Sequence, residues 1–204
     1  MLRFIILSIS ILTLISNYLI FNSYRYQTIL FNEFNTSTFT FSSYKLNEIN
    51  YKYPSLAFNS VPILTYISKY NTENEKFNGA VDQLKESLTF NPNSTYTKYL
   101  LSRNYIFLND LKNAERYLEE IFESSPKIES SSALYLSILE KNQNITKLNN
   151  IYYKMTEIEN KNIWIYYISA LKNTTQLSSD KSLYNKALFF FKTNKFSDSI
   201  RLKN

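Results

Sequence analysis

Hydrophobic and polar residues from about residue 61 onward alternate with the period of an α-helix. Apolar side chains over residues 63–70 fall on one helical face, and those over residues 77–88 fall on a second. A polar turn at residues 71–75 separates the two faces, and Pro92 ends the second because proline cannot continue a helix. The pattern therefore predicts two consecutive helices joined by a short turn.

The same arrangement of two helices and a turn recurs in the next segment of the chain. Residues 99–108 and 111–121 each present one apolar face, and Pro126 follows the second. Corresponding positions in the two pairs are separated by one constant interval: Ser68 and Ser102, Phe77 and Leu111, Ala80 and Ala114, Leu84 and Leu118, and Pro92 and Pro126. This repeat period of about 34 residues is typical of arrays of helix pairs.

Small residues explain why the helices of a pair can pack closely. Ser68 lies on the first helix and Ala80 on the second, and Ser102 and Ala114 repeat the spacing between them. We expect the small residues at the crossing of each pair, with large residues filling the layer between pairs. One pair cannot bury both of its faces alone, so the pairs must stack.

The stretch at residues 97–128 resembles a tetratricopeptide repeat (TPR). Large, small, aromatic and proline residues stand where that family's signature places them: Leu101, Ser102, Tyr105, Ala114, Leu118, Ile121 and Pro126. Lys98 departs from the pattern, since it stands where the family often has tryptophan. The resemblance covers residues 61–126 well and 180–200 moderately. It implies an all-α protein, a TPR-like α-solenoid of antiparallel helix pairs that binds other proteins without catalysis.

The pattern is weaker after Pro126. Residues 133–139 and 148–158 are expected to form one pair, and residues 163–171 an extra helix that interrupts the array. Ala187 and Ser199 repeat the spacing of Ser68 and Ala80, which places the first helix of a last, incomplete repeat at Ala187. Trp164, the only tryptophan, lies in an apolar run and is expected in the core rather than in a ligand site.

The amino terminus carries a nearly uncharged apolar run at residues 2–21, whose only charge is Arg3. Twenty helical residues span about 30 Å, the thickness of the hydrocarbon core of a bilayer. The residues that follow show no small-residue cleavage site, so the run favours a transmembrane anchor over a cleaved signal peptide. The flanking charges barely discriminate the orientation, and we expect the rest of the chain to be exported, to the periplasm if the source is bacterial.

These features predict three segments. Residues 1–25 form the transmembrane anchor, residues 26–60 connect it and contain one helix at about 41–51, and residues 61–204 form the TPR-like domain. A strand at residues 38–42 is the less favoured alternative for the connecting segment, because a lone strand has nothing to pair with.

Composition removes several classes of chemistry. The 204 residues include one glycine, no cysteine and no histidine, which excludes glycine-rich phosphate loops, thiolate chemistry and imidazole bases or metal ligands. The net charge of +6 is spread along the chain without the dense basic patch of a nucleic-acid reader. We expect no catalytic residue, no metal, no cofactor and no nucleic-acid partner.

One candidate binding site remains. In a TPR stack the first helices line the inner groove, which would receive Thr65, Lys69 and Thr72 from one repeat. The next repeat would contribute Tyr96, Tyr99, Arg103 and Phe107. Lys69 and Arg103 are one repeat period apart and are expected one above the other, where two cations beside aromatic rings could hold an acidic peptide or a chain-terminal carboxylate.

A second resemblance is confined to the order of segments. A membrane segment, a YPSL-like stretch at residues 53–56 and TPR units are similar to the tail of bacterial O-antigen ligase or polymerase-type membrane proteins. In that family the chemistry belongs to a multi-span part absent from this sequence, so the resemblance implies only an accessory role in envelope polysaccharide assembly. The two functions to be weighed are therefore a membrane-anchored scaffold and such an accessory domain.

Overall fold

The computed structural model describes residues 2–41, 43–175 and 181–193. These residues form eleven helices and no strand. Two compact units divide the chain, residues 1–109 and residues 110–204. The first unit contains α1 (Leu2–Thr36), α2 (Ser43–Glu48), α3 (Ile63–Glu73), α4 (Phe77–Phe90) and α5 (Thr95–Phe107). The second contains α6 (Leu111–Ser124), α7 (Glu129–Lys141), α8 (Ile145–Asn150), α9 (Tyr152–Thr156), α10 (Lys161–Thr175) and α11 (Ser182–Thr193).

The expected small residues are buried. Ser68 and Ala80, in α3 and α4 of the first unit, are both 0% exposed, and Ser102 and Ala114 are equally inaccessible. α3 packs extensively against α4, and α4 against α5. The prediction of helix pairs with small residues at buried positions is therefore confirmed, and the fold is all-α and TPR-like.

The turns inside successive pairs share one backbone conformation. Glu75, Asn109 and Gln143 each have a φ between 51° and 58°, and each follows the previous one by a full repeat period. A left-handed residue of this kind ends the first helix and redirects the chain toward the second. The next residue begins the following helix: Asp110 and Asn144 accept a hydrogen bond from the backbone of Asn113 and Lys147, respectively, at 3.1 Å. Lys76, at the same place in the first pair, makes no such bond.

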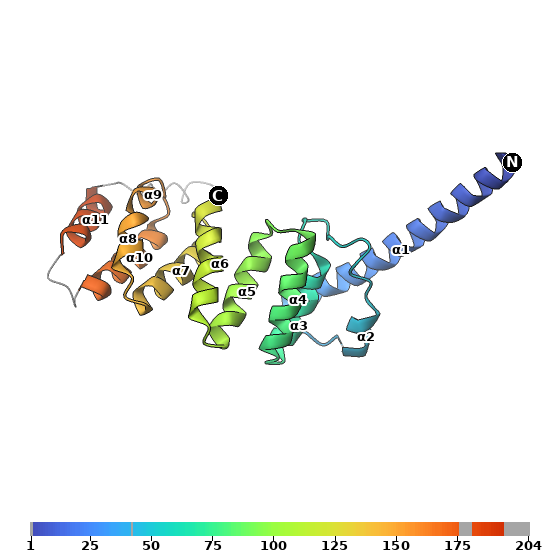
Figure 1. Ribbon diagram of the computed structural model, residues 1–204, viewed down its shortest axis with the longest axis horizontal. Coiled ribbons are helices and arrows are strands. Elements are labelled where there is room, and N and C mark those ends of the chain that lie inside the picture. The colour runs from blue at the N-terminus through green and yellow to red at the C-terminus, as the bar shows by residue number, and fades with distance from the viewer. Residues whose placement is uncertain (1, 42, 176–180, 194–204) are drawn as a thin grey trace, which may run out of the picture. The chain divides into compact units, whose positions relative to one another are not determined.

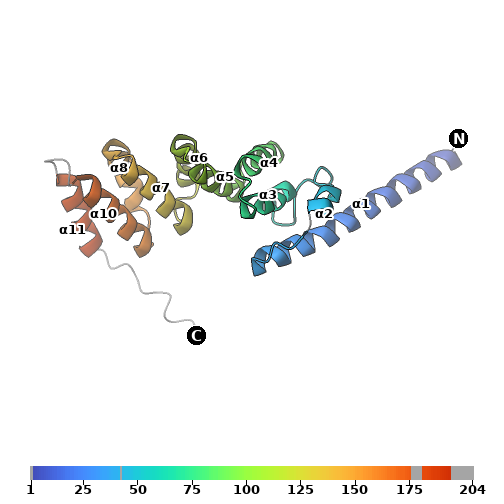
Figure 2. The same cartoon turned by 90° about the horizontal axis from the view of Figure 1, so that it is seen from below.

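α1 (Leu2–Thr36) is longer than its apolar part. α1 continues through residue 25 to Thr36 without a break, and its first part extends away from the other helices of the first unit (Figures 1 and 2). Every side chain from Arg3 to Ile15 is exposed. By length and composition this helix could cross a membrane. The later part is docked instead: Ser23, Gln27, Leu30 and Glu33 are at most 9% exposed and follow one face of the helix.

The connecting segment contains the short helix α2, which covers less of the chain than the expected 41–51. Residues 38–41 are irregular and form no strand. Phe39 and Phe41 from this segment join the first unit's hydrophobic core, which also includes Leu30 of α1 and Ile63 and Tyr66 of α3.

The structure of the second unit shows that the prediction of an inserted extra helix is wrong. Residues 163–171 belong to α10, which packs against α7 and α8 and is paired with α11. First helices thus begin at Ile63, Thr95, Glu129 and Lys161, at intervals close to the repeat period and with no inserted helix. Ala187 is fully buried but lies on the second helix of the fourth pair, whereas the sequence had placed it on a first helix. Its expected partner Ser199 lies outside the described residues.

The third pair explains why the sequence pattern predicted an inserted helix. Leu136 and Leu148 stand at the positions where the first two pairs have serine and alanine, and both are 0% exposed. The second helix of this pair is broken at Ile151 into α8 and α9. Large residues at the crossing and a divided helix hide the repeat from a search for small residues.

Trp164 lies in the core of the second unit, as expected. Its side chain is 0% exposed, its indole N–H donates to the Ile158 carbonyl at 2.8 Å, and its ring stacks on Phe190 with centroids 4.9 Å apart.

Candidate functional site

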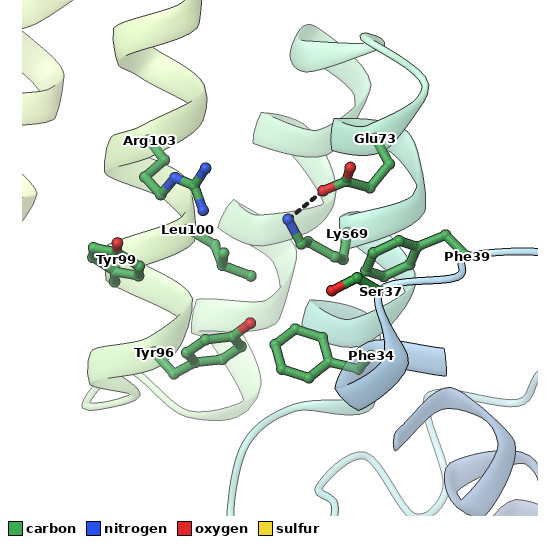
Figure 3. Close-up of a pocket in the computed structure, with 9 residues that line it drawn as sticks. All are labelled: Phe34, Ser37, Phe39, Lys69, Glu73, Tyr96, Tyr99, Leu100 and Arg103. Atoms are coloured by element: carbon green, nitrogen blue, oxygen red, sulfur yellow. Dashed lines mark hydrogen bonds and ion pairs between the residues drawn. The ribbon is translucent and has the colours of Figure 1, made fainter. Parts of the chain in front are cut away.

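A cavity of about 350 Å³ lies in the first unit, between the end of α1, α3 and α5 (Figure 3). We call it the α1–α3–α5 pocket. Four of the five groove residues expected from the sequence line it: Lys69, Tyr96, Tyr99 and Arg103. The remaining lining residues are Phe34, Ser37, Phe39, Glu73 and Leu100.

Phe107, the fifth expected residue, does not line the pocket. Its ring is 51% exposed and stacks on Phe77 at a centroid distance of 4.8 Å. It remains beside the site, since the Arg103 guanidinium lies 5.9 Å from its centroid. Phe107 therefore supports the position of Arg103 from outside the cavity.

Thr65 and Thr72 are not groove residues. Thr65 is 0% exposed, and its hydroxyl lies 2.8 Å from that of Thr97 on α5. Thr72 donates to the Asn104 side-chain oxygen at 3.1 Å. Both threonines were expected in the groove because they lie on the first helix, but they face the neighbouring first helix and tie α3 to α5. Hydrogen bonds of this kind satisfy polar groups that would be costly to bury alone.

The two cations of the pocket have different surroundings. Lys69 forms an ion pair with Glu73, one turn later on α3, and its ammonium lies 5.5 Å from the Phe39 ring centroid. Arg103 has no carboxylate within ion-pair distance in the described part of the chain. Its guanidinium points toward the side of the pocket occupied by α3 (Figure 3) and lies 6.0 Å from the Tyr99 ring centroid. Arg103 is therefore the cation available to an anionic ligand.

Aromatic rings form the wall opposite the cations. Phe34 of α1 packs edge-on against Tyr96 of α5 with centroids 5.7 Å apart, and Tyr66 lies next to both rings. Burial raises the pKa of the Tyr96 hydroxyl, with a smaller contribution from Tyr66, so this group stays protonated and can donate a hydrogen bond. The wall thus offers apolar surface with one polar donor.

The chain turns sharply where it leaves α1. Ser37 and Phe39 both have positive φ, 54° and 37°, which is unusual for a residue as large as phenylalanine. Glu33 holds the turn: its carboxylate accepts hydrogen bonds from the Thr40 hydroxyl at 2.7 Å and from the Phe41 N–H at 3.0 Å. Because the turn is fixed, Ser37 and Phe39 are positioned at the pocket.

The sequence missed Phe34, Ser37 and Phe39 because they precede the repeats and do not follow the repeat period. A signal was available in Tyr26, Leu30 and Phe34, which recur at every fourth position and give the end of α1 an apolar face. Glu73 could also have been predicted beside the site, since it lies one helical turn after Lys69 on the same helix.

A second hollow of about 600 Å³ lies in the second unit and involves α6, α8 and the turn before α8. Its acidic residues are already engaged: Lys147 bridges Glu115 and Glu119 at 2.8 and 2.7 Å, and Asn142 donates to Glu115 at 2.8 Å. Burial opposes the charge on Lys147, but the hydrogen bonds to the two glutamates outweigh it and raise its pKa. This network fastens α6 to α8, and we favour the α1–α3–α5 pocket as the binding site.

Comparison with known proteins supports the fold. No family model matches the chain, and no curated protein matches it. Among solved structures, it is similar to one titled "MamA RS-1 ArsTM double mutant", with a TM-score of 0.51. The match covers 83% of this chain and 92% of that chain, with 11% identical residues. MamA is a TPR-like protein, and a likeness at this level of identity establishes a TPR-like fold for this chain.

Proposed function

We propose that this protein is a non-catalytic, single-pass membrane scaffold whose α1–α3–α5 pocket binds an acidic segment of a partner protein. Residues 1–25 would anchor it, residues 26–60 would connect the anchor, and the TPR-like residues 61–204 would lie on the exported side of the membrane. The TPR-like fold supports a protein partner, since helix-pair arrays present extended binding surfaces. The apolar, exposed first part of α1 supports the anchor.

The observation that carries the proposal is the position of Arg103. An arginine side chain without a carboxylate partner in the described residues faces a cavity with aromatic walls. A guanidinium binds carboxylates through two parallel hydrogen bonds, and aromatic rings provide contact area for apolar side chains. An extended segment that alternates acidic and aromatic or aliphatic residues fits both features.

The test compares charge reversals on the same helix. Full-length protein in detergent is titrated with a short fluorescent peptide of Glu-Phe-Ser repeats that is amidated at its carboxyl end. We expect Arg103→Glu to weaken binding about tenfold or more, which corresponds to roughly 1.4 kcal/mol. Lys98→Glu makes the same charge change on α5 outside the pocket and should leave binding nearly unchanged.

Three further results would change the proposal. Equal affinity of the wild-type protein and Arg103→Glu, both with unchanged circular dichroism, would remove the pocket as the peptide site. Binding that requires a free terminal carboxylate in place of the amide would assign the pocket to chain ends. Co-purification with a multi-span glycan ligase or polymerase would favour the accessory role in envelope polysaccharide assembly.

A further inference from the structure

The apolar segment and the pocket share one uninterrupted helix. α1 includes residues 2–21 and also Phe34, which lines the pocket. Sharp bends in helices usually occur at proline or at glycine and serine pairs. Residues 2–36 contain neither proline nor glycine, and α1 runs through them as one α-helix, so no proline or glycine offers a bend between the segment and the pocket.

The docked face of α1 prevents the first unit from turning about the helix. Burial begins at Ser23, just after the apolar segment, and continues through Gln27 and Leu30 to Glu33. Glu33 also accepts a hydrogen bond from Tyr70 of α3 at 2.7 Å. Four buried side chains spread over three turns, with a hydrogen bond at the far end, fix both the rotation and the axial position of the helix.

The distance from the apolar segment to the pocket follows from helix geometry. Thirteen positions along α1 lead from Phe21 to Phe34. At about 1.5 Å per residue, they correspond to about 20 Å along the helix axis. Any tilt of α1 would shorten this distance measured perpendicular to the bilayer.

The pocket is also small for a site that must act alone. One available cation and about 350 Å³ of space provide few contacts for a segment that binds on its own. A partner confined to the same membrane compensates, because confinement raises the effective concentration of its segment without any new contact.

We propose that the pocket receives an acidic segment of a partner that is itself membrane-bound, at about 20 Å from the edge of the hydrocarbon core. This inference rests on the proposed function. An extended chain advances about 3.3 Å per residue, so roughly the first six to ten residues after the partner's own membrane segment would reach the pocket. The acidic and apolar residues are expected in that juxtamembrane stretch.

The height of the pocket is tested first, without any ligand. The chain has no cysteine, so Thr38→Cys at an exposed position beside the pocket gives a single labelling site. Energy transfer from a dye at this site to rhodamine-labelled lipid is measured in phosphatidylcholine vesicles. We expect a closest approach of about 20 Å. Seven alanines inserted after Phe21 should increase it by about 10 Å while turning the helix by only about 20°.

The partner class is tested with the Glu-Phe-Ser peptide in three forms: free, anchored by a palmitoyl chain through a short linker, and anchored through a linker about seven residues longer. The insertion variant should bind the free peptide like the wild-type protein. It should bind the short-anchored peptide about tenfold more weakly and recover with the longer linker.

The outcomes separate the two proposals. An unchanged energy-transfer distance after insertion, or equal binding of the short-anchored peptide by both proteins, would overturn the inference. Failure of the wild-type protein to bind the free peptide would overturn the proposed function and the partner class with it, whereas the energy-transfer distance still decides the height of the pocket.

Discussion

Tyr70 on α3 donates a 2.7 Å hydrogen bond to Glu33 on α1, across 37 residues of sequence. This contact joins the helix that carries the apolar segment to the first TPR-like pair. Burial raises the pKa of the Tyr70 hydroxyl, and the hydrogen bond and negative charge of Glu33 raise it further. The hydroxyl therefore remains a donor throughout the neutral pH range.

Replacing Tyr70 with phenylalanine should loosen α1 from α3. The change removes a hydrogen bond to a buried carboxylate, which typically contributes about 1.5–3 kcal/mol. Urea unfolding of the detergent-solubilised protein, followed by circular dichroism, should show a loss of this size, and hydrogen exchange should quicken over residues 23–34. Tyr53→Phe, at a side chain that is 48% exposed, serves as the control and should change neither measurement. Unaltered exchange in Tyr70→Phe would show that the hydrogen bond does not hold α1.

Lys76 is a position where one substitution should stabilise the protein. Asp110 and Asn144 cap the second helices of the next two pairs, whereas Lys76 leaves α4 without a side-chain cap. Lys76→Asp should add a cap and place a negative charge at the helix start, for a gain of about 1 kcal/mol. Lys76→Ala removes the same positive charge without providing a cap, and the difference between the two unfolding free energies measures the cap together with the negative charge at the helix start. Equal stability of the two variants would contradict the prediction.

The close packing of α3 and α4 can be tested with neighbouring residues. Ala80 is fully buried, so Ala80→Leu should overpack the pair and cost about 1–3 kcal/mol. Gly79, one position earlier, is exposed, and an added methyl group would meet the Asn71 side-chain nitrogen at an ordinary 3.6 Å. Gly79→Ala should instead gain about 0.5–1 kcal/mol by removing a flexible residue from a helix. Thermal unfolding midpoints that shift in the same direction for both variants would refute this account of the packing.

Trp164 reports on the second unit. Trp164→Phe removes the donor of the buried Ile158 carbonyl and should cost about 1–3 kcal/mol, measured by circular dichroism during urea unfolding. Tyr166→Phe on the same helix is the control, because that side chain is 45% exposed. In the wild-type protein the tryptophan emission should be blue-shifted and poorly quenched by iodide. Strong quenching under native conditions would place the indole in contact with solvent.

Much of the first two pairs could be predicted from the sequence because the relevant forces act locally and recur. Ser68 and Ala80 are small and fully buried, and small, fully buried residues recur one repeat period later at Ser102 and Ala114. The third pair was predicted as two helices over residues 133–139 and 148–158, but it was not recognised as a member of the repeat, because Leu136 and Leu148 satisfy the same burial with large side chains. More than one combination of side-chain sizes can bury the contact between two paired helices. The third pair therefore keeps the structural repeat without its sequence signature.

The candidate site, too, could be predicted from the sequence only in part. Lys69 and Arg103, one repeat period apart, both line one cavity, but the helical pattern also predicted that Thr65 and Thr72 would line the groove. A helical period places a residue on a face, whereas the neighbouring helix decides whether that face is open. Thr65 and Thr72 face Thr97 and Asn104, and no spacing within the sequence could distinguish this interface from an open surface.

The sequence by itself determined that this protein is all-α, that its first four repeat helices are paired, and that an apolar helix precedes them. These properties depend on residue size, helical period and hydrophobicity, which can be read from residues close together in the sequence. Only the tertiary structure decided that α1 continues past its apolar part, docks on α3 and supplies Phe34 to the pocket. Such contacts join residues distant in sequence, and they depend on shape and hydrogen-bond complementarity between surfaces that exist only after the helices have formed.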